Sequence, residues 1–346
     1  QTTASYNTAL GHQALNLNTS GANNTASGFK ALSANTTGHS NTALGAEAGD
    51  AITIGRYNTA LGYGALTTDI DGDFSTALGF GALQTQESDG ANQAVHNTAV
   101  GSYAGNGLTT AIHSTFVGGF AGGNAALTGD NNTGVGYRSM YSNTSGSENT
   151  GLGKDALFSN TVGAYNTAVG EGALYTNVDG SNSVAVGRLA LYNQDPASAV
   201  NMHNTAVGYN AGGAVTVGIN NTLIGALAGD AIVGAQENTS LGVHAGGAVT
   251  EGDSNVFIGY NSGVHAQATI TGGTNTIVGA YAHTTADDSA SANGFGYNIA
   301  AIAGYTTVGA GNDDIRAAHG NTTWSTISDE RYKKDIVDST AGLSFI

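Results

Sequence analysis

Three aspartates at alternate positions give the sequence a set of metal-binding side chains. They are Asp69, Asp71 and Asp73, in the stretch Asp69-Ile70-Asp71-Gly72-Asp73. Carboxylates spaced in this way occur in calcium loops, because Ca²⁺ takes several hard oxygen ligands. The downstream glutamate that completes such a loop is missing. We take the three aspartates as candidate calcium ligands and expect no other cofactor.

Three histidines share one position of a repeat. His96, His113 and His203 each stand directly before a copy of a five-residue word. On a threefold axis, imidazoles from such a position would surround a metal ion. Other copies carry Asn, Tyr, Glu, Phe, Ser or Thr there, so we favour a solvated corner over a metal site.

The elements that position these side chains follow from the repeated word itself, which is close to Asn-Thr-Ala-(Val/Leu/Ile)-Gly. Its sixteen copies begin at Asn7, Asn24, Asn41, Asn58, Ser75, Asn97, Ser114, Asn132, Asn149, Asn166, Ser183, Asn204, Asn221, Asn238, Asn255 and Asn275. Eleven of the fifteen steps between copies are 17 residues, and the other four are longer. Repeats of this size stack on one another because one unit alone cannot bury a face.

Each position of the repeat, counted from the first residue of the word, has its own requirement. Position 5 is Gly in all sixteen copies and position 8 is always Ala or Ser, which indicates a corner and tight packing. A second Gly recurs at position 15. Position 4 is aliphatic in fifteen copies, with Ser27 the exception, and we expect this ladder to form the core.

Short strands bounded by Gly and Asn, without helical periodicity, predict an all-β fold. The expected architecture is a parallel β-solenoid or β-roll of about sixteen 17-residue coils. Strand spacing of ~4.8 Å makes this a rod roughly 75 Å long. Each coil has few large apolar side chains, so we expect an intertwined or side-by-side homotrimer to supply further burial.

Four insertions interrupt the repeat, and solenoid insertions often build a binding face. The polar residues in two of them are candidate ligand contacts: Gln86, Glu87, Asp89, Gln194 and Asp195. Tolerated surface insertions are the plainer interpretation of the same loops.

Two polar side chains of the word recur at the same position of successive coils and so form rows, or ranks, along the rod. Thr occupies position 2 in fourteen copies, and a Thr ladder is one way to bind ice. Ice-binding faces generally carry two Thr ranks per coil, whereas here Thr alternates with Ala, which points to the other face. We therefore favour a structural Thr rank, and an Asn ladder that caps each turn.

Composition excludes several function classes. The formal net charge of −16 disfavours nucleic acid and anionic membrane surfaces as partners. No apolar run is long enough for membrane insertion, and the lack of cysteine excludes disulfides and thiol ligands. Acidic residues are scattered over the coils, so we see no carboxylate pair for glycan cleavage and expect no enzyme in the mature rod.

Words such as Ser183-Val184-Ala185-Val186-Gly187 and Asn255-Val256-Phe257-Ile258-Gly259 resemble the head repeats of trimeric autotransporter adhesins. The resemblance covers about residues 5 to 283, although coils in that family are typically somewhat shorter. It implies a left-handed trimeric β-roll.

The C-terminal segment Ser328-Asp329-Glu330-Arg331-Tyr332-Lys333-Lys334-Asp335-Ile336 resembles the opening of the endosialidase-type intramolecular chaperone domain. That family assembles phage tail fibres into trimers and then releases itself by autoproteolysis. The resemblance implies Ser328 as nucleophile, Lys333 as general base and Asp329 as an assisting acid. Only about 19 residues match, and we expect them to begin as a short helix with Ser328 as N-cap.

These observations divide the chain into a rod (1–283), an irregular Gly/Ala-rich transition (284–327) and the start of a chaperone domain (328–346). The function expected is that of a phage tail fibre: an extracellular or virion homotrimer that contacts other virion components and a host glycan or protein receptor. The alternatives are a bacterial cell-surface or secreted adhesin and, further off, an ice-binding solenoid.

Overall fold

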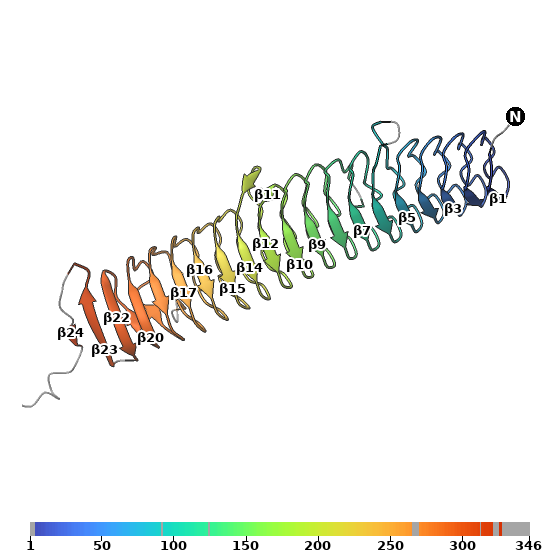
Figure 1. Ribbon diagram of the computed structural model, residues 1–346. Helices are drawn as coiled ribbons and strands as arrows, with labels where there is room; N and C mark the ends of the chain where they lie inside the picture. The colour runs from blue at the N-terminus through green and yellow to red at the C-terminus, as the bar shows by residue number, and fades with distance from the viewer. Residues whose placement is uncertain are drawn as a thin grey trace, which may run out of the picture.

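The protein winds into one long rod of stacked coils (Figure 1). The computed structural model describes residues 4–90, 93–123, 125–264, 270–311, 313–320 and 325–326. Neighbouring coils pair in parallel and in register, so that Thr8 lies opposite Thr25 and Thr25 opposite Thr42. The predicted parallel β-solenoid is therefore confirmed. The short C-terminal helix expected from Ser328 lies outside the described residues.

Each copy of the word forms one strand of three residues at positions 2–4. These strands are β1 (Thr8–Leu10), β2 (Thr25–Ser27), β3 (Thr42–Leu44), β4 (Thr59–Leu61), β5 (Thr76–Leu78), β6 (Thr98–Val100), β7 (Thr115–Val117), β8 (Thr133–Val135), β9 (Thr150–Leu152), β10 (Thr167–Val169), β12 (Val184–Val186), β14 (Thr205–Val207), β15 (Thr222–Ile224), β16 (Thr239–Leu241), β17 (Val256–Ile258) and β18 (Thr276–Val278). Two smaller parallel pairs lie beside this sheet. They join β11 (Gly180–Ser181) to β13 (Val200–Asn201) and β19 (His283–Thr284) to β21 (Ala300–Ala301).

The sheet continues beyond residue 283, into a segment that we expected to be irregular. Strands β20 (Asn293–Tyr297) and β22 (Tyr305–Ala310) extend the parallel stack. The following strands β23 (Asp313–Ala318) and β24 (Ser325–Thr326) pair antiparallel. The word survives there in degenerate form: Gly294 takes the place of the buried Ala, and Gly296 has φ 144°, like the Gly at position 5.

The core does not contain the aliphatic ladder of position 4, which corrects our expectation. In the strands, the third residue of the word is buried, as at Ala43, Ala60 and Ala77, while the fourth faces outward. Side chains alternate between the two faces of a strand, so only one of these positions can point inward. Ala is the commonest residue at the inward position, where four coils instead bury Phe116, Leu223, Phe257 or Ile277, and the aliphatic side chains of position 4 face outward.

The residue at position 1 is buried and forms a ladder of amides, as predicted. Asn24 donates from its side-chain nitrogen to the carbonyl of Gly38 at 2.8 Å, and its side-chain oxygen accepts from the backbone N–H of Asn41 at 2.9 Å. The Gly at position 5 is required both by its φ and by close backbone approach. A Cβ on Gly28, at φ 143°, would lie 2.2 Å from the carbonyl oxygen of Gly45.

Most of the large core side chains come from positions 9 and 12, and these two positions are complementary. Eight coils place Leu or Met at position 9 and a polar side chain at position 12. Their pairs are Leu15 with Asn18, Leu32 with Asn35, Leu66 with Asp69, Leu83 with Gln86, Met140 with Asn143, Leu157 with Asn160, Leu174 with Asn177 and Leu191 with Gln194.

Seven other coils place Gly at position 9 and an aliphatic residue at position 12 or its equivalent. Their pairs are Gly49 with Ile52, Gly105 with Leu108, Gly122 with Leu127, Gly212 with Val215, Gly229 with Ile232, Gly246 with Val249 and Gly263 with Ile270. A Cβ on Gly49 would lie 3.0 Å from Cδ1 of Ile52, so the aliphatic chain fills the space that Leu takes in the other coils. These fifteen coils thus fill one interior site in one of two ways, and beside Gly122 and Gly263 the rings of Phe116 and Phe257 also occupy it.

Candidate functional site

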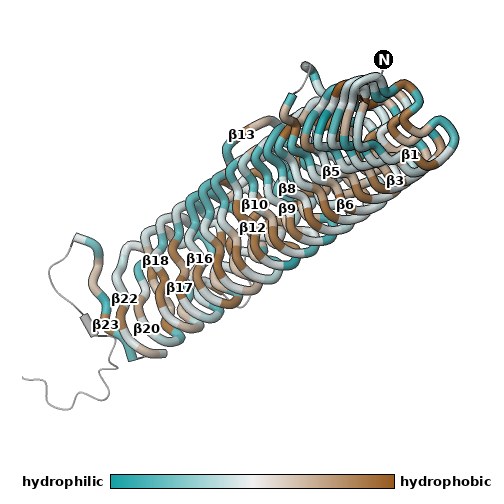
Figure 2. Tube along the Cα trace, turned by 45° about the vertical axis from the view of Figure 1, so that its right-hand side comes forward, coloured by the Kyte–Doolittle hydropathy of each residue, from teal (hydrophilic) through white to brown (hydrophobic). Residues whose placement is uncertain are grey.

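The strand face is an exposed apolar surface that follows the rod. It consists of Thr at position 2 and the aliphatic residue at position 4, and Figure 2 shows hydrophobic residues following the strands along the rod. Leu44 is 49% exposed and Leu241, eleven coils away, is 45% exposed. A monomer rarely leaves so long an apolar patch in water, so this face has the character of an interface.

The insertion loops hold both buried and exposed polar residues. Glu87, Asp89 and Asp195 are exposed and remain candidate contacts, whereas Gln86 and Gln194 are fully buried. Figure 1 shows the loop near residue 90 and the arm of β11 projecting from the same edge of the rod. The buried glutamines cannot reach a ligand at the surface, so their role is structural.

Each buried glutamine belongs to a coil whose word begins with Ser instead of Asn. Gln86 donates to the hydroxyl of Ser75 at 2.8 Å and accepts from the side-chain amide of Asn97 at 3.0 Å. Gln194 donates to Ser183 at 3.0 Å and accepts from Asn204 at 2.9 Å. In most other coils, Asn at position 1 supplies a side-chain amide to the ladder. In these two coils the longer glutamine at position 12 supplies that amide in place of the serine.

The three candidate calcium ligands have different surroundings. Asp73 is buried and pairs with the guanidinium of Arg56 at 2.8 Å. Asp69 is also buried and accepts from Gln86 at 2.6 Å, while Asp71 is partly exposed. Burial raises the pKa of the Asp69 carboxyl, and the hydrogen bond from Gln86 acts in the opposite direction. Within the described residues, no group of three or more His, Cys, Asp or Glu side chains is arranged to hold a metal ion.

The histidines lie on an exposed corner. The rings of His96 and His113 stack with centroids 5.6 Å apart, and His96 also stacks on Phe74 at 4.8 Å. His203 is exposed on a coil further along the rod. The proposed autocleavage residues Ser328, Asp329 and Lys333 lie outside the described residues.

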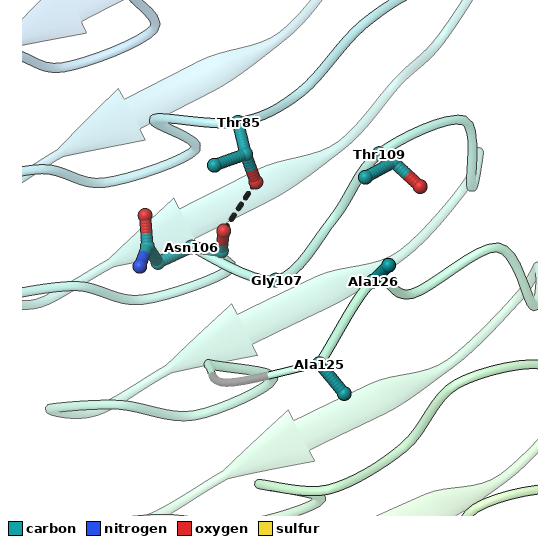
Figure 3. A pocket seen from close by; sticks show the side chains of 6 residues that line it. All are labelled: Thr85, Asn106, Gly107, Thr109, Ala125 and Ala126. Carbon is teal, nitrogen blue, oxygen red and sulfur yellow. Dashed lines mark hydrogen bonds between the residues drawn. The ribbon is translucent and has the colours of Figure 1, made fainter.

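A cavity of about 260 Å³ opens beside the first insertion. Its lining residues are Thr85, Asn106, Gly107, Thr109, Ala125 and Ala126 (Figure 3). The hydroxyl of Thr85 donates to the carbonyls of Asn106 and Leu108, which ties the coils together. These six residues offer hydroxyl and amide groups but no acid or base, so this cavity has no evident catalytic chemistry.

Sequence reasoning missed a specialised corner on four successive coils. Aromatic rings at position 10 stack along the rod there, with centroids 5.0 to 5.3 Å apart and interplanar angles of 3° to 12°. These rings belong to Tyr141, Phe158, Tyr175 and Tyr192. The signal was visible in the sequence, because position 10 is otherwise aliphatic, polar or Gly in the sixteen repeats.

A row of ion pairs runs beside this aromatic stack. Arg138 pairs with Asp155 at 2.8 Å, and its guanidinium lies 4.9 Å from the ring centroid of Phe158. Lys154 lies within 3.5 Å of both Asp155 and Glu171, and Glu171 also pairs with Arg188 at 3.2 Å. The stack and the row of charges thus form one continuous surface, which we call the aromatic corner.

Comparison with protein-family models, with curated proteins and with solved structures gave no match. Within the part of the chain that the structure describes, no helix is long and apolar enough to cross a membrane.

Proposed function

We propose that the chain forms the rod of a homotrimeric fibre of the phage tail-fibre type, which attaches to a receptor on a host cell. The observation that carries this proposal is the outward ladder of aliphatic side chains on the strand face. It spans the rod from Leu10 on β1 to Val278 on β18. In a trimer, the three strand faces would meet at a common axis and remove these side chains from water.

Burial of this face is on the scale of the cost of association. Burying the exposed part of one aliphatic side chain contributes about 1 kcal/mol. The fifteen aliphatic residues at position 4 would together contribute on the order of 10 kcal/mol per protomer, comparable with the entropic cost of association. Parallel, in-register packing of identical rods repeats the same contact in every coil.

The C-terminal resemblance supports the same assembly. A chaperone that folds the end of the chain into a trimer would bring three rods together, and cleavage at Ser328 would then release it. In this proposal the mature rod is an extracellular virion component without enzymatic activity.

A bacterial cell-surface or secreted adhesin is the alternative, and an autotransporter adhesin would continue into a coiled-coil stalk and a membrane anchor.

Ice binding receives no support from the strand face. Each coil presents one Thr rank and, beside it, an aliphatic rank rather than a second row of hydroxyls. We therefore do not propose an ice-binding function.

The test is native mass spectrometry of the chain expressed with its complete C-terminal domain. We expect a trimer, together with a fragment that begins at or beside Ser328. Ser328→Ala and Lys333→Ala should each abolish the fragment while the trimer persists. A monomeric rod would contradict the fibre, and an uncut product from the unmutated chain would contradict the autoproteolysis.

A further inference from the structure

We propose that the aromatic corner binds an extended neutral polysaccharide, with one sugar residue per coil. This inference rests on the proposed attachment function and identifies the receptor chemistry and the surface that contacts it. The corner occupies the coils that begin at Asn132, Asn149, Asn166 and Ser183, and Tyr209 extends it into the next coil.

The corner differs from the rest of the rod at two positions at once. At position 6, most other coils carry an aromatic, aliphatic or small residue, whereas Lys154, Glu171 and Arg188 follow one another here. At position 10, the same coils carry the stacked aromatic rings. The regular coil needs neither change, because the core positions 3, 8, 9 and 12 do not include them. A shared surface role explains why both changes occur together.

The charges favour a neutral ligand over an anionic one. Each cation in the row already has a carboxylate partner, and the whole chain carries a net charge of −16, which repels polyanions. A sugar hydroxyl donates and accepts hydrogen bonds at the same time. It can therefore bridge the exposed side chains of Glu171 and Arg188 without breaking their ion pair.

Gly172 is buried beneath an apolar contact beside these charges. At position 7 of the preceding coils, Arg138 and Asp155 carry side chains, whereas Gly172 carries none. A Cβ built there would lie 3.5 Å from ring carbons of Tyr192 and 3.0 Å from Cδ2 of Leu189. The ring of Tyr192 and the side chain of Leu189 thus offer C–H contacts to the apolar face of a sugar, next to Glu171 and Arg188.

The spacing of the corner fits a polymer. Its rings repeat every 5.0 to 5.3 Å along the rod, and an extended pyranose chain advances by nearly the same distance per residue. The same contact can therefore recur from coil to coil. In each coil the corner follows the turn at position 5, where Gly170 has φ 129°. Its side chains therefore lie on a different surface from the strand face that we assign to the trimer.

The experiment is calorimetric titration of the assembled protein with cellohexaose, mannohexaose and a hexamer of galacturonic acid. We expect at least one neutral hexamer to bind, with affinity rising from the disaccharide to about the tetramer or pentamer and then levelling. Gly172→Asn should weaken binding at least tenfold, because its side chain would displace Leu189 and the ring of Tyr192. Asn tolerates this backbone, since Asn210 occupies position 7 with φ 51°.

Gly81→Asn is the matched control, because Gly81 occupies position 7 with φ 60° outside the corner and is crowded by the ring of Tyr103, so this change should leave binding unchanged. The double variant Glu171→Gln/Arg188→Gln tests the exposed charges with little risk to folding. Binding of the acidic hexamer alone would overturn the neutral assignment. Absence of binding, or equal binding by Gly172→Asn and the unmutated chain, would overturn the site. Native mass and cell attachment, measured on the same samples, show separately whether the proposed fibre function holds.

Discussion

The side-chain amide of Gln194 donates a hydrogen bond to the hydroxyl of Ser183 at 3.0 Å, in the coil where Ser replaces the usual Asn at the start of the word. Gln86 and Ser75 repeat this relationship at 2.8 Å. In both coils a shorter side chain at position 1 occurs with a longer one at position 12. The interior amide network is therefore maintained by paired substitutions.

Shortening Gln194 should expose this dependence. In Gln194→Asn the amide no longer reaches Ser183, so buried polar groups lose partners and we expect a loss of about 2 kcal/mol in the free energy of unfolding. Adding Ser183→Asn should recover at least half of this lost free energy. In the preceding coil, Asn occupies both position 1 and position 12, as Asn166 and Asn177. Urea unfolding followed by circular dichroism measures both effects. The exposed Gln236→Asn is the control, and additive losses in the double variant would refute the pairing.

Replacing Asp69 by Asn should stabilise the rod at neutral pH by about 1 kcal/mol. Asn177 shows the arrangement that would result: its side-chain oxygen accepts from Gln194 and its amide donates to the carbonyl of Gly180. Burial raises the folded-state pKa of Asp69. The ionised, buried carboxylate therefore lowers the stability of the fold at pH values above that pKa, and this loss of stability disappears as the pH falls through it.

The gain from Asp69→Asn should therefore shrink in acid. Unfolding curves recorded between neutral pH and pH ~4 measure this trend. The reverse substitution, Asn177→Asp, should destabilise the rod at neutral pH. A gain from Asp69→Asn that is independent of pH would show that the buried charge is not its cause.

The repeat predicted the solenoid because invariant Gly, small residues and a fixed period depend only on local geometry. It did not predict which side of the strand faces inward, since the alternation of Ala43 and Leu44 is the same for either choice. The invariably small position 8 was a sign of a narrow interior. Gln86 was assigned to a ligand because its insertion is polar, and only its pairing with Ser75 shows the structural role.

The two ways of filling the coil interior should be interchangeable when both positions change together. Gly49→Leu alone crowds Ile52 and should cost about 1–3 kcal/mol. Ile52→Asn alone leaves a cavity and should cost about 3 kcal/mol or more. The double variant recreates the pair of Leu32 and Asn35, and we expect it to be more stable than the sum of the single losses by over ~1 kcal/mol. Denaturant unfolding of the four proteins measures this coupling, and strict additivity would contradict complementarity.

The strand face is tested by placing charge on it. The side chains of Leu44 and Leu241 face outward from the coil. Replacing both by Glu should therefore leave the fold of each rod intact. In a trimer the same carboxylates would be brought together away from water, which costs several kcal/mol per charge. We therefore expect Leu44→Glu/Leu241→Glu to shift the native mass from three times 34.3 kDa to 34.3 kDa. Val217→Glu is the matched control, because Val217 is 52% exposed but lies at position 14, away from the strand face. A trimer that tolerates the double substitution as well as the control would place the interface on another surface.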